Sequence, residues 1–114
     1  MKRDMDLIRL ILLDEEGEEK PDLSGYAQEQ IIYHMALLIE AKLAHGAVVL
    51  DENGEPDAAQ ITRLTWEGHE FLDKARSETV WNKTKALAKE KGVSLSVGLL
   101  SGLLTQVAKQ TLGL

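Results

Sequence analysis

Residues 28–65 read QEQIIYHMALLIEAKLAHGAVVLDENGEPDAAQITRLT. The first half, from Gln28 to Ala44, has the apolar spacing of an amphipathic helix. Its expected apolar side holds Ile31, Ile32, Met35, Leu38, Ile39 and Leu43, and its other side holds Glu29, Gln30, Tyr33, His34, Leu37 and Glu40. The second half holds two short β-forming runs, at 47–50 and 60–65, with a charged turn at 51–57 between them. Gly46 separates the helix from the first run and is expected to end the helix. The stretch therefore predicts a helix followed by a β-hairpin with a long tip.

Before this stretch, the sequence predicts one more helix and a loop. Asp4 can cap a helix whose broad apolar stripe predicts contacts on two sides. The acidic run 14–19 opposes the helix dipole at a C-terminus and is expected to form a solvated loop. Only residues 17–26 remain before the next helix, and they are expected to form a turn or a single short strand.

After the hairpin, two further helical segments are expected. Thr65 can cap a helix that begins at Trp66, and the apolar positions change phase near residues 77–79, which predicts a bend or a new helix start there. Gly92 is expected to end this segment and Ser94 to cap a last helix.

The expected fold is α+β and mainly helical. The order helix, helix, β-hairpin wing, helix is typical of a winged-helix-like domain, which we assign to residues 1–76. Residues 77–114 form a C-terminal helical extension that packs on this domain or mediates dimerisation.

Composition narrows the class of protein. The chain has 114 residues, enough for one core, and it has no cysteine, which excludes disulfides and thiolate metal sites. The N-terminus lacks the pattern of a secretory signal, and the apolar C-terminus is interrupted by polar residues, so we expect a cytoplasmic protein without a membrane span. The net charge is −6, with −10 over residues 1–70 and +4 over 71–114. An anionic partner would therefore have to meet the C-terminal part.

Four segments resemble a bacterial and prophage domain family of unknown function. They are Met1–Arg9 (MKRDMDLIR), Ile32-Tyr33-His34, Arg63–Asp73 (RLTWEGHEFLD) and Thr79-Val80-Trp81. The resemblance implies a winged-helix-like fold in a small protein that mobile elements often encode. It implies no activity and no catalytic residues. In the Arg63–Asp73 block, we expect helix-cap and core roles for Thr65, Trp66, Gly68, Phe71 and Leu72.

The chain departs from the pattern of that family at both ends of the second helix. Ala27 stands where a capping hydroxyl or acid is expected, so Gln30 lacks its capping-box partner. Glu40-Ala41-Lys42-Leu43 has lysine where a C-terminal glycine is expected. These departures affect the helix boundaries rather than the fold.

No catalytic, cofactor or metal site is expected. His69-Glu70 begins like a zinc-protease motif, but Asp73 occupies the second ligand position, and surface or capping roles are expected for His34 and His45. Asp51-x-Asn53 begins like a calcium loop, but Pro56 and Thr62 occupy the positions that need glycine and a bidentate glutamate. No phosphate loop or activated nucleophile is evident.

The charges argue against docking of DNA in the usual winged-helix manner. The would-be recognition helix offers Gln28, Glu29, Gln30, Tyr33 and His34, and the would-be wing offers Asp51, Glu52, Glu55 and Asp57. Phosphates bind chiefly to lysine and arginine, so both surfaces would repel DNA. The basic residues lie elsewhere, at Lys74, Arg76, Lys83, Lys85, Lys89 and Lys91. This region could touch nucleic acid, although a solvated helix face is the commoner meaning of the pattern.

Three hypotheses on function follow. The first is a non-enzymatic interaction module that binds a protein partner or itself. A homodimer would use an apolar stripe on the last helix, which consists of Leu95, Leu99, Leu100, Leu103, Leu104 and Val107. The stripe could equally pack within the chain. The second is a DNA-binding regulator that uses the basic residues 74–91, and the third is an acidic phage protein that occupies a nucleic-acid-binding protein of the host.

Overall fold

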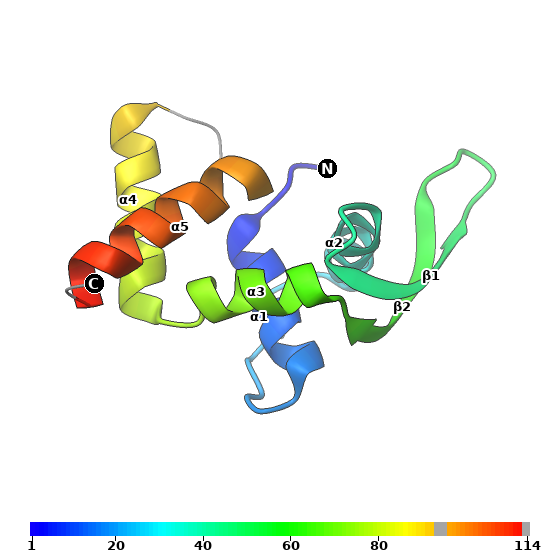
Figure 1. Cartoon of the computed structure of the whole chain (residues 1–114). Helices are drawn as coiled ribbons and strands as arrows, with labels where there is room; N and C mark the ends of the chain where they lie inside the picture. Colours follow the sequence, from blue (N-terminus) through cyan, green and yellow to red (C-terminus); the bar gives the residue numbers. More distant parts are fainter. Residues whose placement is uncertain (93–95, 113–114) are drawn as a thin grey trace. The chain divides into compact units, whose positions relative to one another are not determined.

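The computed structural model of the chain describes residues 1–92 and 96–112. It is α+β and mainly helical, with two antiparallel strands between helices (Figure 1). The elements are α1 (Met5–Glu16), α2 (Gln28–Glu40), β1 (Ala44–Leu50), β2 (Pro56–Leu64), α3 (Trp66–Ala75), α4 (Glu78–Lys91) and α5 (Val97–Leu112). Residues 17–27 contain a turn and neither a helix nor a strand, which agrees with the first of the two predicted alternatives, a turn or a single short strand.

The contacts divide the chain into two compact units, Met1–His69 and Glu70–Leu114. The division falls inside α3, whereas the sequence indicated a division between residues 76 and 77. The first unit holds α1, α2 and the hairpin, and the second holds α4 and α5.

The N-terminal helix begins as predicted and ends later than expected. The carboxylate of Asp4 accepts hydrogen bonds from the backbone N–H groups of Asp6 and Leu7, so Asp4 is the N-cap of α1. The broad apolar stripe is buried at Met5, Leu7, Ile8, Ile11, Leu12 and Leu13. The expectation of a loop from residue 14 onward was wrong, because residues 14–16 complete the last turn and α1 ends at Gly17, where φ is 89°.

The acids in that last turn affect stability. Partial burial, and then the neighbouring carboxylate of Asp14, raise the pKa of Glu15 above its ordinary value of 4.5. A raised carboxyl pKa disfavours the folded state above the folded pKa, and this effect disappears as the pH falls below the unfolded value. Glu15→Gln is therefore expected to stabilise the protein at pH 7 by a few tenths of a kcal/mol, since solvent screens this half-exposed group.

Urea denaturation at several pH values measures this gain. It should shrink as the pH falls through the folded pKa of Glu15 and vanish below about pH 4. Glu18→Gln, in the exposed loop that follows, is the control and should change little. A gain for Glu15→Gln that stayed the same at acidic pH would contradict the assignment.

The second helix ends at a lysine in a left-handed conformation. Lys42 has φ 62°, its N–H donates to the carbonyl of Ile39, and the N–H of Leu43 donates to the carbonyl of Leu38. These two bonds form a Schellman motif, in which the left-handed position is usually glycine. Lysine thus occupies a left-handed position that usually takes glycine. The prediction that the helix extends to Ala44 and stops at Gly46 was wrong, because both residues lie in β1.

Lys42→Gly should stabilise the protein by about 0.5–1 kcal/mol, because glycine adopts positive φ without steric cost. The matched control is Ala41→Gly, one residue earlier, where φ is −76° and glycine brings only additional chain entropy. Thermal or urea unfolding of the two variants should shift in opposite directions. Equal destabilisation by both would count against the role of the left-handed turn.

At its other end, α2 keeps half of a capping box. Ala27 has no side-chain acceptor, yet its own N–H donates to Oε1 of Gln30 at 2.9 Å. The prediction that Gln30 has lost its capping-box partner was therefore wrong for the backbone of Ala27 and correct for its side chain.

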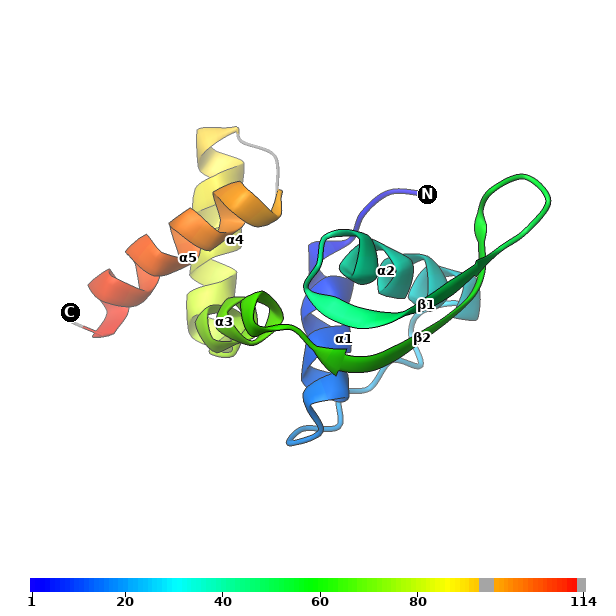
Figure 2. The same ribbon diagram turned by 45° about the vertical axis from the view of Figure 1, so that its right-hand side comes forward.

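The hairpin is longer than predicted. Its strands pair from Ala44 opposite Leu64 to Leu50 opposite Pro56, and the tip is closed by the carboxylate of Asp51, which accepts from the N–H groups of Asn53 and Glu55. The hairpin runs back along α2, and its tip projects past the N-terminal part of that helix (Figure 2). Gly46, which was expected to stop the helix, instead lets β1 pack closely against α2 and β2. A Cβ at this position would lie 2.9 Å from Cδ1 of Ile39 and closer still to the carbonyl oxygen of Gln60.

A buried histidine joins α2 to the start of the chain. The ring of His34 has no exposed surface, its Nδ1 lies 2.7 Å from the carbonyl of Gln30, and its Nε2 accepts from the N–H of Asp4 at 2.8 Å. The expected surface or capping role was wrong for His34. The helix turns His34 and Leu38 inward, while Ile31, Ile32 and Met35 of the expected apolar side are only partly covered.

The Arg63–Asp73 block begins with a backbone junction. Thr65 caps α3, because its Oγ1 accepts from the N–H of Gly68 at 3.0 Å. The same hydroxyl donates to the carbonyl of Lys42 at 2.7 Å, and the N–H of Thr65 donates to the carbonyl of Leu43 at 3.0 Å. The start of α3 is thus bonded directly to the end of α2. The predicted cap at Thr65 is confirmed.

In the second unit, α4 and α5 lie side by side (Figures 1 and 2). Of the two predicted alternatives, the structure shows the new helix start, since α3 ends at Ala75 and Ser77 caps α4 by accepting from the N–H of Val80. Gly92 ends α4 in a left-handed conformation, as predicted. The predicted cap Ser94 lies outside the described residues, and the hydroxyl of Ser96 accepts from the N–H of Leu99 at the start of α5.

Candidate functional site

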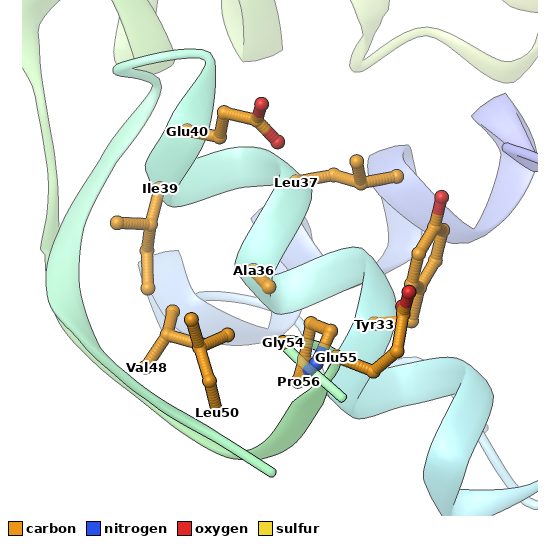
Figure 3. Close-up of a pocket in the computed structure, with 10 residues that line it drawn as sticks. All are labelled: Tyr33, Ala36, Leu37, Ile39, Glu40, Val48, Leu50, Gly54, Glu55 and Pro56. Atoms are coloured by element: carbon orange, nitrogen blue, oxygen red, sulfur yellow. The ribbon is translucent and has the colours of Figure 1, made fainter. Parts of the chain in front are cut away.

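A groove of about 440 Å³ lies between α2 and the hairpin. Figure 3 shows Ile39 of α2 beside Val48 and Leu50 of β1, while Tyr33, Leu37 and Glu40 follow α2 along its other side. Ala36, Gly54, Glu55 and Pro56 complete the lining. The floor and walls are mostly apolar, and Leu50 keeps 57% of its surface exposed. Such a concave apolar surface is typical of a binding site rather than of a solvated helix face.

The charges at this groove are negative. The charged residues of its lining are Glu40 and Glu55, and the exposed Asp51, Glu52 and Asp57 lie at or next to the hairpin tip. Residues 1–69 together carry a net charge of −9. The groove is therefore suited to an apolar or basic ligand and unsuited to phosphate.

Acidic groups at the start of α1 act on the loop before α2. Partial burial, and then the carboxylates of Asp4 and Asp6, raise the pKa of the Tyr26 hydroxyl. Acidic groups of α1 thus add to the negative potential of the first unit.

A second hollow, of about 510 Å³, lies at the start of α3. Its lining includes Ile39, Lys42, His45, Trp66 and Glu67. The expected core role of Trp66 was wrong, because 75% of its surface is exposed at the first position of the helix. The other residues of the block for which cap or core roles were expected are buried: Thr65, Gly68, Phe71 and Leu72.

The leucine stripe of the last helix is mostly covered by the chain itself. Leu100, Leu104 and Val107 are buried, Leu103 is half-buried and Leu99 is exposed. Leu95 lies outside the described residues. A partner could therefore reach only the outer edge of the predicted dimer surface.

The predicted basic residues do not form one patch. Lys74 donates to the hydroxyl of Ser101 at 3.2 Å, and Arg76 pairs with Asp73 at 3.4 Å. On α4, Lys85 and Lys89 share one side, because an α-helix turns about 100° per residue. Lys83 and Lys91 lie on the opposite side of α4 by the same geometry. The phosphate backbone of a nucleic acid could therefore contact only some of these basic residues at once.

The described residues were also compared with the requirements of a metal site and of a membrane-spanning helix. Among residues 1–92 and 96–112, no three histidine or acidic side chains come together to hold a metal ion. His45 and His69 are exposed, and the calcium-like Asp51 uses its carboxylate on backbone N–H groups. In that same part of the chain, no helix has both the length and the apolar character needed to cross a bilayer.

Sequence reasoning missed the groove itself. Leu37 was placed on the polar side of α2, and Leu50 was treated only as a strand residue. A leucine among glutamates and glutamines on a solvent face is the signal that could have indicated a contact surface.

Comparisons with other proteins agree with the resemblance seen in the sequence. Residues 2–94 match a family described as "Hypothetical protein (DUF2513)". An uncharacterized protein of Haemophilus influenzae is 38% identical over 120 residues, which cover 98% of this chain and 99% of that relative. No solved structure matches the chain. The chain belongs to the DUF2513 family of hypothetical proteins.

Proposed function

We propose that this chain is a non-enzymatic, winged-helix-like interaction module that binds a protein partner in the groove between α2 and the hairpin. The order α1, α2, hairpin, α3 supports the comparison with a winged helix, whose recognition helix and wing commonly face DNA. With it we propose a cytoplasmic location and, on the resemblance, an origin in a mobile element.

One observation carries the proposal. The surface that would face DNA has an apolar floor with a half-exposed Leu50, and its charged lining residues are glutamates. Exposed apolar surface beside polar groups favours protein contacts, whereas carboxylates repel phosphate. The alternative DNA-binding regulator would have to use lysines that lie on opposite sides of α4.

The test compares two exposed leucines. A partner captured from cells of the source organism is identified, purified and titrated against the full chain by calorimetry. Leu50→Asp, in the groove, should weaken binding about tenfold or more, because it places a charge in an apolar contact. Leu99→Asp, on α5 and 51% exposed, should bind within about twofold of the unchanged chain.

Two results would reject the proposal. One is equal binding by both leucine variants. The other is salt-sensitive binding of DNA by the full chain that Leu50→Asp leaves unchanged, which would favour the regulator. A full chain that forms a dimer by light scattering, with Leu99→Asp abolishing it, would instead assign the contact to the last helix.

A further inference from the structure

The groove and the hollow at Trp66 are parts of one surface. Ile39 lines both of them, with Leu50 at the hairpin end of the groove and Trp66 in the hollow. This joint surface, from Leu50 through Ile39 to Trp66, belongs entirely to the first unit. A single extended or helical segment of a partner could therefore occupy both hollows.

Two large exposed apolar side chains line this surface. In the described part of the chain, they are Leu50 at 57% and Trp66 at 75% exposed. The other large apolar residues that are exposed are Met1 at the chain start, Val49, which lines neither hollow, and Leu99 on α5. Tryptophan is enriched among the residues that dominate binding energy at protein interfaces. Trp66 is thus the natural anchor for a ligand that enters the hollow.

The charges of the joint surface select the ligand. Glu40, Glu55 and Glu67 line it, against one lysine, Lys42. Arginine can stack on the indole of Trp66 and bond a carboxylate through its fork of N–H groups, and lysine can pair with the same carboxylates. An acidic segment would meet like charges.

We propose that this joint surface binds a segment of another protein in which arginine or lysine stands beside large apolar side chains, with Trp66 as the anchor. The inference rests on the proposed function and adds the chemistry of the partner. A second copy of the chain fits less well. The exposed positions of its basic helix α4 carry no large apolar side chain that could fill the groove.

The experiment selects short random peptides displayed on phage against the immobilised full chain. The enriched peptides should be net basic and contain large apolar residues, and their binding should weaken with added salt. Trp66→Ala should lower the affinity of a synthesised peptide about thirtyfold, the loss typical of an interface hot spot. The double variant Glu40→Lys, Glu55→Lys should bind basic peptides with lower affinity. Leu99→Asp should leave the peptide affinity unchanged.

Each other result has a defined meaning. Peptides that depend on Leu50 but not on Trp66 would overturn the anchor and leave the proposed function intact. Enrichment of acidic or uncharged peptides, or no enrichment at all, would overturn the partner chemistry. Salt-sensitive self-association of the full chain that Leu50→Asp abolishes would assign the surface to a second copy and overturn the inference. Circular dichroism confirms that each variant is folded, as expected for substitutions at exposed positions.

Discussion

Replacing Gly68 with alanine is expected to lower the free energy of unfolding by about 3–5 kcal/mol. A Cβ at position 68 would overlap the carbonyl oxygen of Leu43 and lie 3.0 Å from the carbon of that carbonyl. That oxygen accepts the N–H of Thr65, whose hydroxyl also bonds Lys42, so relief of the overlap would disturb the whole junction. The gain in helix propensity from glycine to alanine is only about 1 kcal/mol and cannot offset this loss.

The matched control is Gly98→Ala in α5. No atom lies within 4 Å of a Cβ added at Gly98, so alanine should stabilise the helix by up to about 1 kcal/mol. Urea denaturation followed by circular dichroism measures both variants. If Gly68→Ala does not fold, Thr65→Val gives a graded measurement, with an expected loss of about 2 kcal/mol from the missing cap and hydrogen bond. Similar stabilities for Gly68→Ala and Gly98→Ala would show that the junction is not tightly packed.

Replacing His34 with alanine is expected to cost about 2–4 kcal/mol. The substitution removes a fully buried ring and leaves the N–H of Asp4 and the carbonyl of Gln30 without the side chain they bond. Because Asp4 also caps α1, the change should loosen the start of that helix. His69→Ala, at an exposed position on α3, should stay within about 0.5 kcal/mol of the unchanged protein.

A nitrogen spectrum of the histidine rings gives an independent test. The ring atom that faces a backbone N–H must accept, so His34 should carry its proton on Nδ1 and none on Nε2. Long-range nitrogen–proton correlations distinguish the two forms. Protonation of Nε2 in the folded protein would contradict the bond to Asp4.

The sequence predicted the elements whose signals are local. Asp4 and Thr65 cap helices with side chains of the types preferred at N-caps, and the new start of α4 was indicated by a change in the phase of the apolar positions. The coarse α+β class and the hairpin were predicted from the same kind of evidence. Lys42 adopts a left-handed conformation, which is the conformation that a C-terminal glycine would adopt.

The features that sequence reasoning missed depend on tertiary contacts. Periodicity placed His34 on the polar side of α2, and only its pairing with Asp4, thirty residues earlier, explains its burial. Gly46 carries a helix-stop signal, but in the fold it permits close packing of β1 against Ile39 and Gln60. Leu50 and Trp66 were assigned by residue type to strand and core. Their exposure depends on how the hairpin and the start of α3 pack in the fold, which residue type does not determine.

The central claim is that the groove between α2 and the hairpin binds protein in the cell. The most direct test places a photo-crosslinking amino acid at Leu37, which lines the groove, and at Lys83 on α4, in the full chain expressed in cells of the source organism. The account predicts a discrete adduct with one protein from position 37 and none from position 83. Adducts with nucleic acid from position 83, or no protein adduct from position 37, would contradict it.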